Sequence, residues 1–123
     1  MTMKRRQVGL AGEKEARNYL ESKGYEIIET NYRCPLGEID IIAREQETIV
    51  FIEVRTRTGL AFGGPEESIN FKKAHQMRRL AQYYLKTISV NERPCRIDLV
   101  AVRLKKNDLN LEHLNHLKGI LAG

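Results

Sequence analysis

Three ionisable residues on two neighbouring apolar segments have the types and spacing needed for chemistry on phosphate groups. Asp40 lies in the segment GEIDIIA, and Glu53 and Arg55 lie in the segment IVFIEVRTR. Both segments are rich in β-branched residues and flank a short polar turn, which predicts strands at residues 38–44 and 48–56. Side chains two positions apart on a strand share a face. Glu53 and Arg55 are therefore predicted to point to the same side of the sheet.

The pairing register of these two strands decides whether the two carboxylates meet. If Asp40 lies opposite Glu53, then Glu38 lies opposite Arg55, and these charged side chains share one face. The other face is then apolar and contains Ile39, Ile41, Ile52 and Val54. A slip by one residue would place Asp40 opposite Ile52 and mix polar with apolar side chains. The alternation thus favours a pair of carboxylates whose Cβ atoms lie about 5 Å apart.

Two carboxylates at this separation repel each other unless a positive charge lies between them. Mg²⁺ or Mn²⁺ would supply that charge, because hard divalent cations bind carboxylate oxygens together with water and phosphate oxygens. Such an ion can activate water and stabilise a phosphate under attack, and Arg55 could hold a phosphate oxygen. The same residues are compatible with a solvated sheet face, on which Asp40 and Glu53 form salt bridges with Arg55 or Arg57. The apolar surroundings of Glu53 favour the metal site, since a buried ionised group is costly without a partner.

The segment before these strands predicts a helix and a strand that would help to position the pair. Residues 10–23 have helical spacing and are followed by Gly24, a residue suited to the end of a helix. The inward-facing stripe of this helix contains Gly9, Glu13, Ala16 and Leu20. Glu13 would then point toward the sheet, although a carboxylate early in a helix is also favoured by the helix dipole. A first strand is predicted at residues 25–33.

The second half of the chain predicts a helix at residues 70–86 and a buried strand at residues 96–104. The apolar stripe of the helix contains Ala74, Met77, Ala81, Tyr84 and Leu85. A Gly- and Pro-containing loop at residues 59–65 precedes it, and residues 62–65 either cover a substrate or only connect strand to helix. A short strand at residues 109–111 is a further option. The order helix, three strands, helix, strand predicts a mixed sheet flanked by helices, which is an α/β fold.

Length and composition predict one domain spanning residues 1–123, with a flexible basic N-terminus at residues 1–8 and a peripheral tail at residues 106–123. The 21 Lys and Arg residues exceed the 16 Asp and Glu residues, and the net charge of +5 is compatible with a polyanionic partner. Cys34 and Cys95 lack metal-ligand spacing and are expected to be reduced, partly buried thiols. No apolar run is long enough to span a membrane, so a cytoplasmic protein without a membrane partner is expected.

The second predicted helix also carries basic and polar residues at helical spacing. This group contains Lys72, Gln76, Arg78 and Arg79, and Arg57 is a similar candidate on the strand. These side chains could follow a phosphate backbone, or they could form an ordinary solvated surface. Asp98 is expected to be structural, either pairing with Arg96 or capping the end of the sheet. No metal-site spacing links the three histidines, and surface positions are expected for His75, His113 and His116.

The two strand segments also belong to a longer series of motifs in a fixed order. The further motifs are GLAGEKEARNYLESKGY at residues 9–25, FGGPEESI at 62–69, KAHQM at 73–77 and RIDLVAV at 96–102. Together they resemble the bacterial YraN-like family, which is considered related to the PD-(D/E)XK nuclease superfamily and to archaeal Holliday junction resolvases. The resemblance covers nearly the whole chain.

The resemblance implies a restriction-endonuclease-like α/β fold with an α-β-β-β-α-β core. It implies that Asp40 and Glu53 are ligands of Mg²⁺ or Mn²⁺, that the Val54 backbone carbonyl is a third ligand, and that Glu13 reaches the site from the first helix. The implied activity is hydrolysis of phosphodiester bonds in DNA without an organic cofactor. Branched or structured DNA in repair or recombination is the candidate substrate, and a homodimer is a candidate assembly.

The chain departs from the family pattern at one catalytic position, because Arg55 replaces the motif lysine. Arginine is always protonated and cannot act as a general base, but it can still stabilise negative charge. Lys73, on the second predicted helix, matches a family lysine and could point toward the sheet or lie on a solvated basic surface. The replacement keeps a second function open, namely a catalytically weak or inactive nuclease-fold module that binds nucleic acid or a protein partner.

Overall fold

The structure, a computed structural model, describes residues 5–59, 71–89 and 93–120. In this part of the chain the strands form one mixed β-sheet. The helices are α1 (Arg5–Ser22) and α2 (Phe71–Thr87), and the strands are β1 (Glu26–Cys34), β2 (Gly37–Glu45), β3 (Thr48–Thr58), β4 (Cys95–Leu104) and β5 (Leu111–Leu117). The strand order is β1-β2-β3-β4-β5, and β3 and β4 are parallel while the other neighbours are antiparallel. The predicted α/β fold with its mixed sheet is therefore confirmed.

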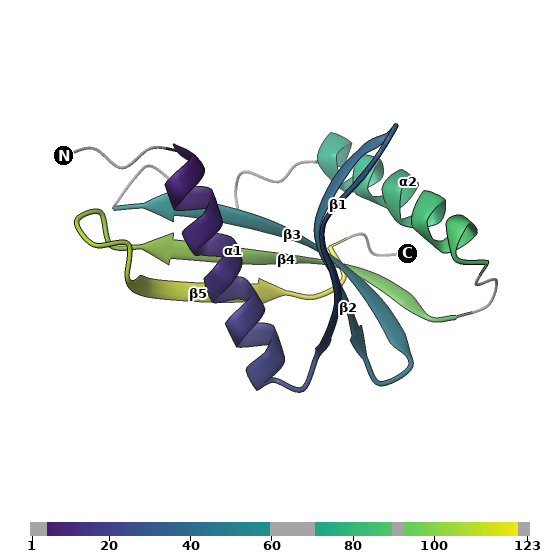
Figure 1. Cartoon of the computed structure of the whole chain (residues 1–123), viewed down its shortest axis with the longest axis horizontal. Coiled ribbons are helices and arrows are strands. Elements are labelled where there is room, and N and C mark those ends of the chain that lie inside the picture. The colour runs from purple at the N-terminus through teal and green to yellow at the C-terminus, as the bar shows by residue number, and fades with distance from the viewer. Residues whose placement is uncertain (1–4, 60–70, 90–92, 121–123) are drawn as a thin grey trace.

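The two helices pack on opposite faces of the sheet (Figure 1). Successive residues of β3 divide between two apolar clusters, because side chains alternate along a strand. Val50 and Ile52 pack with α1, whereas Ile49 and Phe51 pack with α2. The predicted stripe of α2 is confirmed at its buried positions, which are Ala74, Met77, Ala81 and Tyr84.

Helix α1 begins earlier than predicted and ends where predicted. It starts at Arg5, so residues 5–8, which were predicted to belong to a flexible basic N-terminus, are part of the helix. At the other end Gly24 adopts a φ of 90°, and the Tyr25 N–H donates to the Leu20 carbonyl at 3.0 Å. This is the pattern of a helix terminated by glycine in the left-handed conformation.

The closest approach between α1 and the sheet occurs at Gly12, which is buried against β3. A Cβ atom at this position would lie 1.9 Å from Thr56 Oγ1. The predicted stripe contained Gly9, but a Cβ atom there would meet no other atom within 4 Å. The absence of a side chain at Gly12 therefore sets the distance between α1 and β3.

We expect Gly12→Ala to lower the free energy of unfolding by about 2 kcal/mol or more, because the helix must move away from β3 to admit the methyl group. Gly9→Ala is the matched control and should stabilise the protein by about 0.5–1 kcal/mol, since alanine is the better helix former. Urea unfolding of the two variants measures both values. Equal stability of the two variants would show that Gly12 is not a packing requirement.

Strand β5 lies later than the short strand predicted at residues 109–111. It occupies residues 111–117, within the predicted tail 106–123, and pairs with β4 as the edge of the sheet. Leu109 instead lies in the turn before β5, with a φ of 59°. The sequence signal was weak because the strand is polar and partly exposed on this edge.

A buried polar cluster connects β4, β5 and α1. Asp98 is fully buried and accepts hydrogen bonds from Arg96 Nε at 2.8 Å and from the Gly119 N–H at 3.0 Å. His116 Nε2 lies 2.7 Å from Asp98 Oδ2, and its Nδ1 lies 3.1 Å from the Tyr19 hydroxyl. The predicted pairing of Asp98 with Arg96 is confirmed. The predicted surface position of His116 is wrong, because its side chain is only 5% exposed.

Two smaller predictions concern the membrane and the cysteines. Neither described helix is both long and apolar enough to cross a membrane. Neither cysteine forms a disulfide, and Cys34 is partly buried as predicted. Cys95 is exposed, so the prediction of a partly buried thiol is wrong for it.

Candidate active site

The two predicted carboxylates lie where strands β2 and β3 separate. The pairing of β2 with β3 runs from Glu45 opposite Thr48 to Ile41 opposite Ile52, which is the predicted register. It ends one pair before Asp40 and Glu53. In place of the next backbone hydrogen bond, Asp40 Oδ2 accepts the Val54 N–H at 2.8 Å. The Asp40 side chain is thus held at the start of the gap between the two strands.

The separation of the strands also changes which side Ile39 faces. Ile39 packs with Ile42 and Tyr84 in the cluster on the α2 side, whereas Ile41 packs in the cluster on the α1 side. The prediction that Ile39 and Ile41 share one apolar face is therefore wrong. Beyond Asp40 the β1–β2 hairpin curls toward α2, and Gly37 lies near Leu80 (Figure 1).

Glu53 is the most buried acidic residue of the site, with 6% of its surface exposed. Its Oε2 lies 3.1 Å from Arg55 Nη2 and 3.8 Å from Lys73 Nζ. Lys73 thus points toward the sheet, which is one of the two positions that the sequence left open. Burial and the adjacent Asp40 raise the pKa of Glu53 to about 7, in spite of these two cations.

Asp40 and Glu53 are close enough to shift each other's pKa: Asp40 raises the pKa of Glu53, and the interaction with Glu53 acts to lower the pKa of Asp40. Burial also raises the pKa of Asp40 above its usual value, although the hydrogen bond from the Val54 N–H acts in the opposite direction. Because the pKa of Glu53 is about 7, the pair holds a proton in a substantial fraction of molecules at neutral pH. Glu53 is its better holder, since Asp40 already accepts a backbone N–H and gains most by remaining ionised.

Glu13 approaches the pair from helix α1. Burial and the charge of Asp40 raise the pKa of Glu13. With its amide nitrogen turned to the carboxylates, Asn31 donates to Glu13 Oε1 at 3.2 Å and to Glu38 Oε1 at 3.1 Å. Asn31 was missed in the sequence because its contact with Glu13 depends on how α1 packs beside β1. Its φ of 52° is a conformation that asparagine adopts more readily than most residues.

The donor chemistry of the pair fits a hard divalent cation. In the described ranges no three His, Cys, Asp or Glu side chains are grouped as metal ligands. Mg²⁺, however, often uses only one or two carboxylates together with water and phosphate oxygens. Metal binding requires ionised carboxylates and would release the proton that the raised pKa of Glu53 retains. The Val54 carbonyl as a third ligand stays a prediction.

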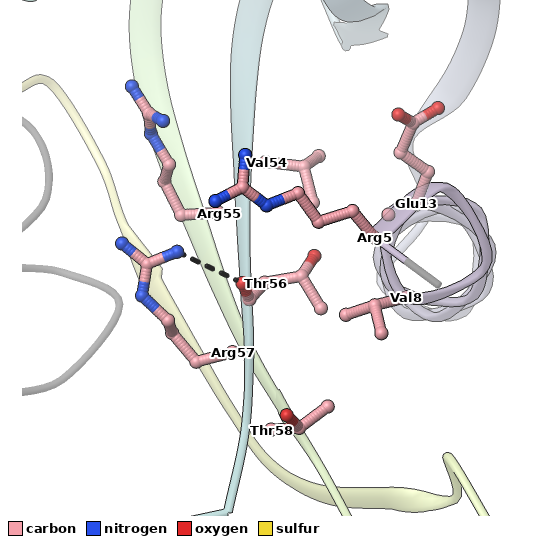
Figure 2. A pocket seen from close by; sticks show the side chains of 9 residues that line it. Arg5, Val8, Glu13, Val54, Arg55, Thr56, Arg57 and Thr58 are labelled. Atoms are coloured by element: carbon pink, nitrogen blue, oxygen red, sulfur yellow. Dashed lines mark hydrogen bonds between the residues drawn. The ribbon is translucent and has the colours of Figure 1, made fainter. Parts of the chain in front are cut away.

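Arg55 contributes a positive charge next to Glu53 on the face of β3 directed away from α1 (Figure 2). Its Nε is buried and has no hydrogen-bond partner among the residues that the structure describes. Leaving a buried donor without an acceptor costs about 1–3 kcal/mol. An oxygen of a bound phosphate is the kind of acceptor that a guanidinium group prefers.

The predicted nucleic-acid-binding residues fall into two places. Helix α2 exposes all of its members, which are Lys72, Gln76, Arg78 and Arg79. Three of these side chains line a groove of about 460 Å³ together with His75 and Leu36 from the β1–β2 turn, and Arg78 is not among its lining residues. Arg57 lies in a different groove, beside α1. The loop at residues 62–65 lies outside the described residues.

The fold and the site define an α/β protein with a mixed sheet and buried carboxylates at the separation of two strands. Residues 12–102 match a family model described as uncharacterised protein family UPF0102. A UPF0102 protein of Moorella thermoacetica is 53% identical over 108 residues, which cover 88% of this chain and 90% of that protein. A UPF0102 protein of Desulforamulus reducens is 43% identical over 123 residues, covering 98% and 100%. The chain belongs to the UPF0102 family, which confirms the predicted family.

Proposed function

We propose that this protein is a cytoplasmic endonuclease that hydrolyses phosphodiester bonds in DNA with the help of Mg²⁺ or Mn²⁺. One observation carries the proposal, namely the approach of the half-buried Asp40 to the buried Glu53 at the separation of β2 and β3. Burying two carboxyl groups against each other costs stability, because each favours ionisation in water. A cation that binds both groups would offset this cost by neutralising their charge.

The residues around the pair have different roles in the proposed hydrolysis. Asp40, Glu53 and the Val54 carbonyl would hold the ion, which supplies a Lewis acid for the phosphate and a more acidic water molecule. Arg55 stabilises negative charge but cannot exchange a proton. Lys73 Nζ is 3.8 Å from Glu53 Oε2, so a lysine is present at the site although the motif position holds arginine. Glu13 orients water from the α1 side.

The DNA substrate is supported by charge and by resemblance. The groove on α2 presents Lys72 and Arg79 at its surface, and such cations bind phosphate backbones without reading the sequence. The similarity of the sequence motifs to resolvases favours branched or structured DNA in repair or recombination. It also favours a homodimer, since a four-way junction has two-fold symmetry.

A nucleic-acid-binding module without catalysis is the second candidate. Arg55 and Lys73 both approach Oε2 of Glu53, which is an oxygen that a metal ion would need. Two cations at this position can satisfy the carboxylate by themselves. In this case the protein binds DNA in the absence of divalent ions and gains nothing from their addition.

Cleavage assays on junction, flap and linear DNA with Mn²⁺ test the two candidates. We expect the wild type to cut at least one substrate and Asp40→Asn to cut it about 100-fold more slowly, because several kcal/mol of charge stabilisation is lost with a metal ligand. Asp108→Asn, at an exposed turn residue, is the matched control and should behave as the wild type. Salt-sensitive DNA binding without cleavage of any substrate, and without metal binding, would replace the first candidate by the second.

A further inference from the structure

A groove of about 700 Å³ runs between the first half of α1 and the last residues of β3 (Figure 2). Its lining consists of Arg5, Val8, Gly9, Glu13, Val54, Arg55, Thr56, Arg57 and Thr58. We call it the arginine groove. Its two walls come from segments about 50 positions apart in the sequence, so only the packing of α1 on β3 creates it.

The lining of the arginine groove is strongly basic. Arg5 extends from α1 toward β3, and Arg55 and Arg57 project from the other side of the same strand (Figure 2). Glu13 is the one carboxylate among these lining residues. Because the pairing of β3 with β2 ends at Ile52, a ligand at this edge of β3 can meet the arginines on both sides of the strand, and like charges raise the local concentration of an oppositely charged ligand. The ligand class that fits is a polyanion.

The chemistry of the lining distinguishes a phosphate backbone from nucleobases. All nine lining residues that the structure describes are non-aromatic. Proteins that hold bases of a single strand stack them on aromatic side chains, whereas guanidinium and hydroxyl groups bind phosphate oxygens. Thr56 and Thr58 add hydroxyl groups to the arginines on this surface. The groove therefore suits a sugar–phosphate backbone of any sequence.

The inner end of the groove meets the carboxylate pair. Glu13 lines the groove and interacts electrostatically with Asp40. Val54 also lines it and donates its N–H to Asp40, and Arg55 contacts Glu53. A strand lying in the groove thus leads directly to the buried pair.

We propose that the arginine groove holds the backbone of one nucleic-acid strand beside the phosphate that is cut, through Arg5 and Arg57 and independently of base sequence. This inference rests on the proposed nuclease function for the position of the cut phosphate. Binding of the strand itself needs neither metal nor cleavage. The arginine groove lies beside α1 and the other groove lies on α2, and because they share no lining residue they contact different parts of a substrate.

The test is the salt dependence of DNA binding by the full chain in EDTA, measured by fluorescence anisotropy on two duplexes of unrelated sequence. The double variant Arg5→Ala/Arg57→Ala should bind both more weakly to the same degree. The slope of log affinity against log salt should decrease by about 2, the value for two lost phosphate contacts. Both side chains are exposed, so the melting temperature should not change.

The matched control is Lys86→Ala/Arg93→Ala, which removes the same charge from exposed positions at the opposite end of the parallel strands. It should keep the wild-type slope. An equal loss of slope in both double variants, or an unchanged slope in the groove variant, would overturn the inference. Failure of the nuclease proposal alone gives another result: the wild type cuts no DNA, but the groove variant still binds DNA more weakly than the wild type.

Discussion

Glu53→Gln is expected to reduce metal-dependent cleavage by about 10³-fold or more and, at the same time, to stabilise the protein above pH 7. The loss of activity follows from the loss of an anionic metal ligand, which contributes several kcal/mol to stabilisation of charge in the transition state. The gain in stability follows from the burial of Glu53, which makes its ionised form unfavourable in the folded state. Glutamine fills the same space and cannot ionise.

The direction of the pH dependence is set by the raised pKa of Glu53. Its pKa is about 7 in the folded protein, against a usual value of 4.5 in the unfolded chain. Between these two values the folded state binds a proton that the unfolded state has lost, so stability falls as pH rises through this window. Each unit of difference corresponds to about 1.4 kcal/mol. We expect the Gln variant to exceed the wild type by about 1–3 kcal/mol at pH 8 and by little at pH 4.5.

Thermal unfolding between pH 4.5 and pH 8 measures this difference, with Glu47→Gln in an exposed turn as the matched control. The control should follow the wild type at every pH. Adding Mg²⁺ at pH 8 should raise the melting temperature of the wild type and not that of Glu53→Gln, because a ligand stabilises only the state that binds it. A Gln variant that is less stable than the wild type at pH 8 would contradict the unfavourable ionisation of buried Glu53. Unchanged cleavage would contradict the catalytic role of Glu53.

The central part of this site was predictable because two local signals agree. Alternating side chains fix the faces of β2 and β3, and a short turn fixes their register, so the approach of Asp40 to Glu53 follows from the sequence. The point at which the ladder ends does not follow from it. Ile39 changes sides there because β2 leaves β3 for α2, and this bend depends on packing between distant segments.

Other features of the molecule depend on contacts that no local pattern contains. His116 looks like a surface residue in its own segment, but its partner Asp98 lies on the neighbouring strand. Gly9 and Gly12 both lie in the same predicted helix region and look alike in the sequence, yet only Gly12 lies against Thr56. Arg5 appeared to belong to a flexible N-terminus, so the arginine groove could not be predicted.

Asp98→Ala is expected to lower the free energy of unfolding by about 3–5 kcal/mol, the usual effect of removing one partner from a buried ion pair. Asp98 is fully buried and accepts hydrogen bonds from three directions, so its removal leaves donors of Arg96, His116 and Gly119 without their acceptor. Asp108→Ala, which removes only an exposed hydrogen bond to the Asn110 N–H, is the control. It should cost about 1 kcal/mol or less.

The pH dependence of this second variant has the opposite sign to that of Glu53→Gln. Burial by itself would raise the pKa of Asp98, but hydrogen bonds from His116, Arg96 and the Gly119 N–H outweigh it and hold the pKa below the usual 3.8. The carboxylate therefore contributes stability above pH 3.8 that is lost as pH falls through its folded pKa. The difference in unfolding free energy between wild type and Asp98→Ala should stay constant from pH 8 to pH 5 and narrow below pH 4.

Asp98 lies opposite Ile52, on the face that packs with α1. Variant protein that remains folded in the cold should therefore keep the response to added metal that depends on Glu53. Loss of that response in folded protein would show that the two buried carboxylate clusters act as one unit.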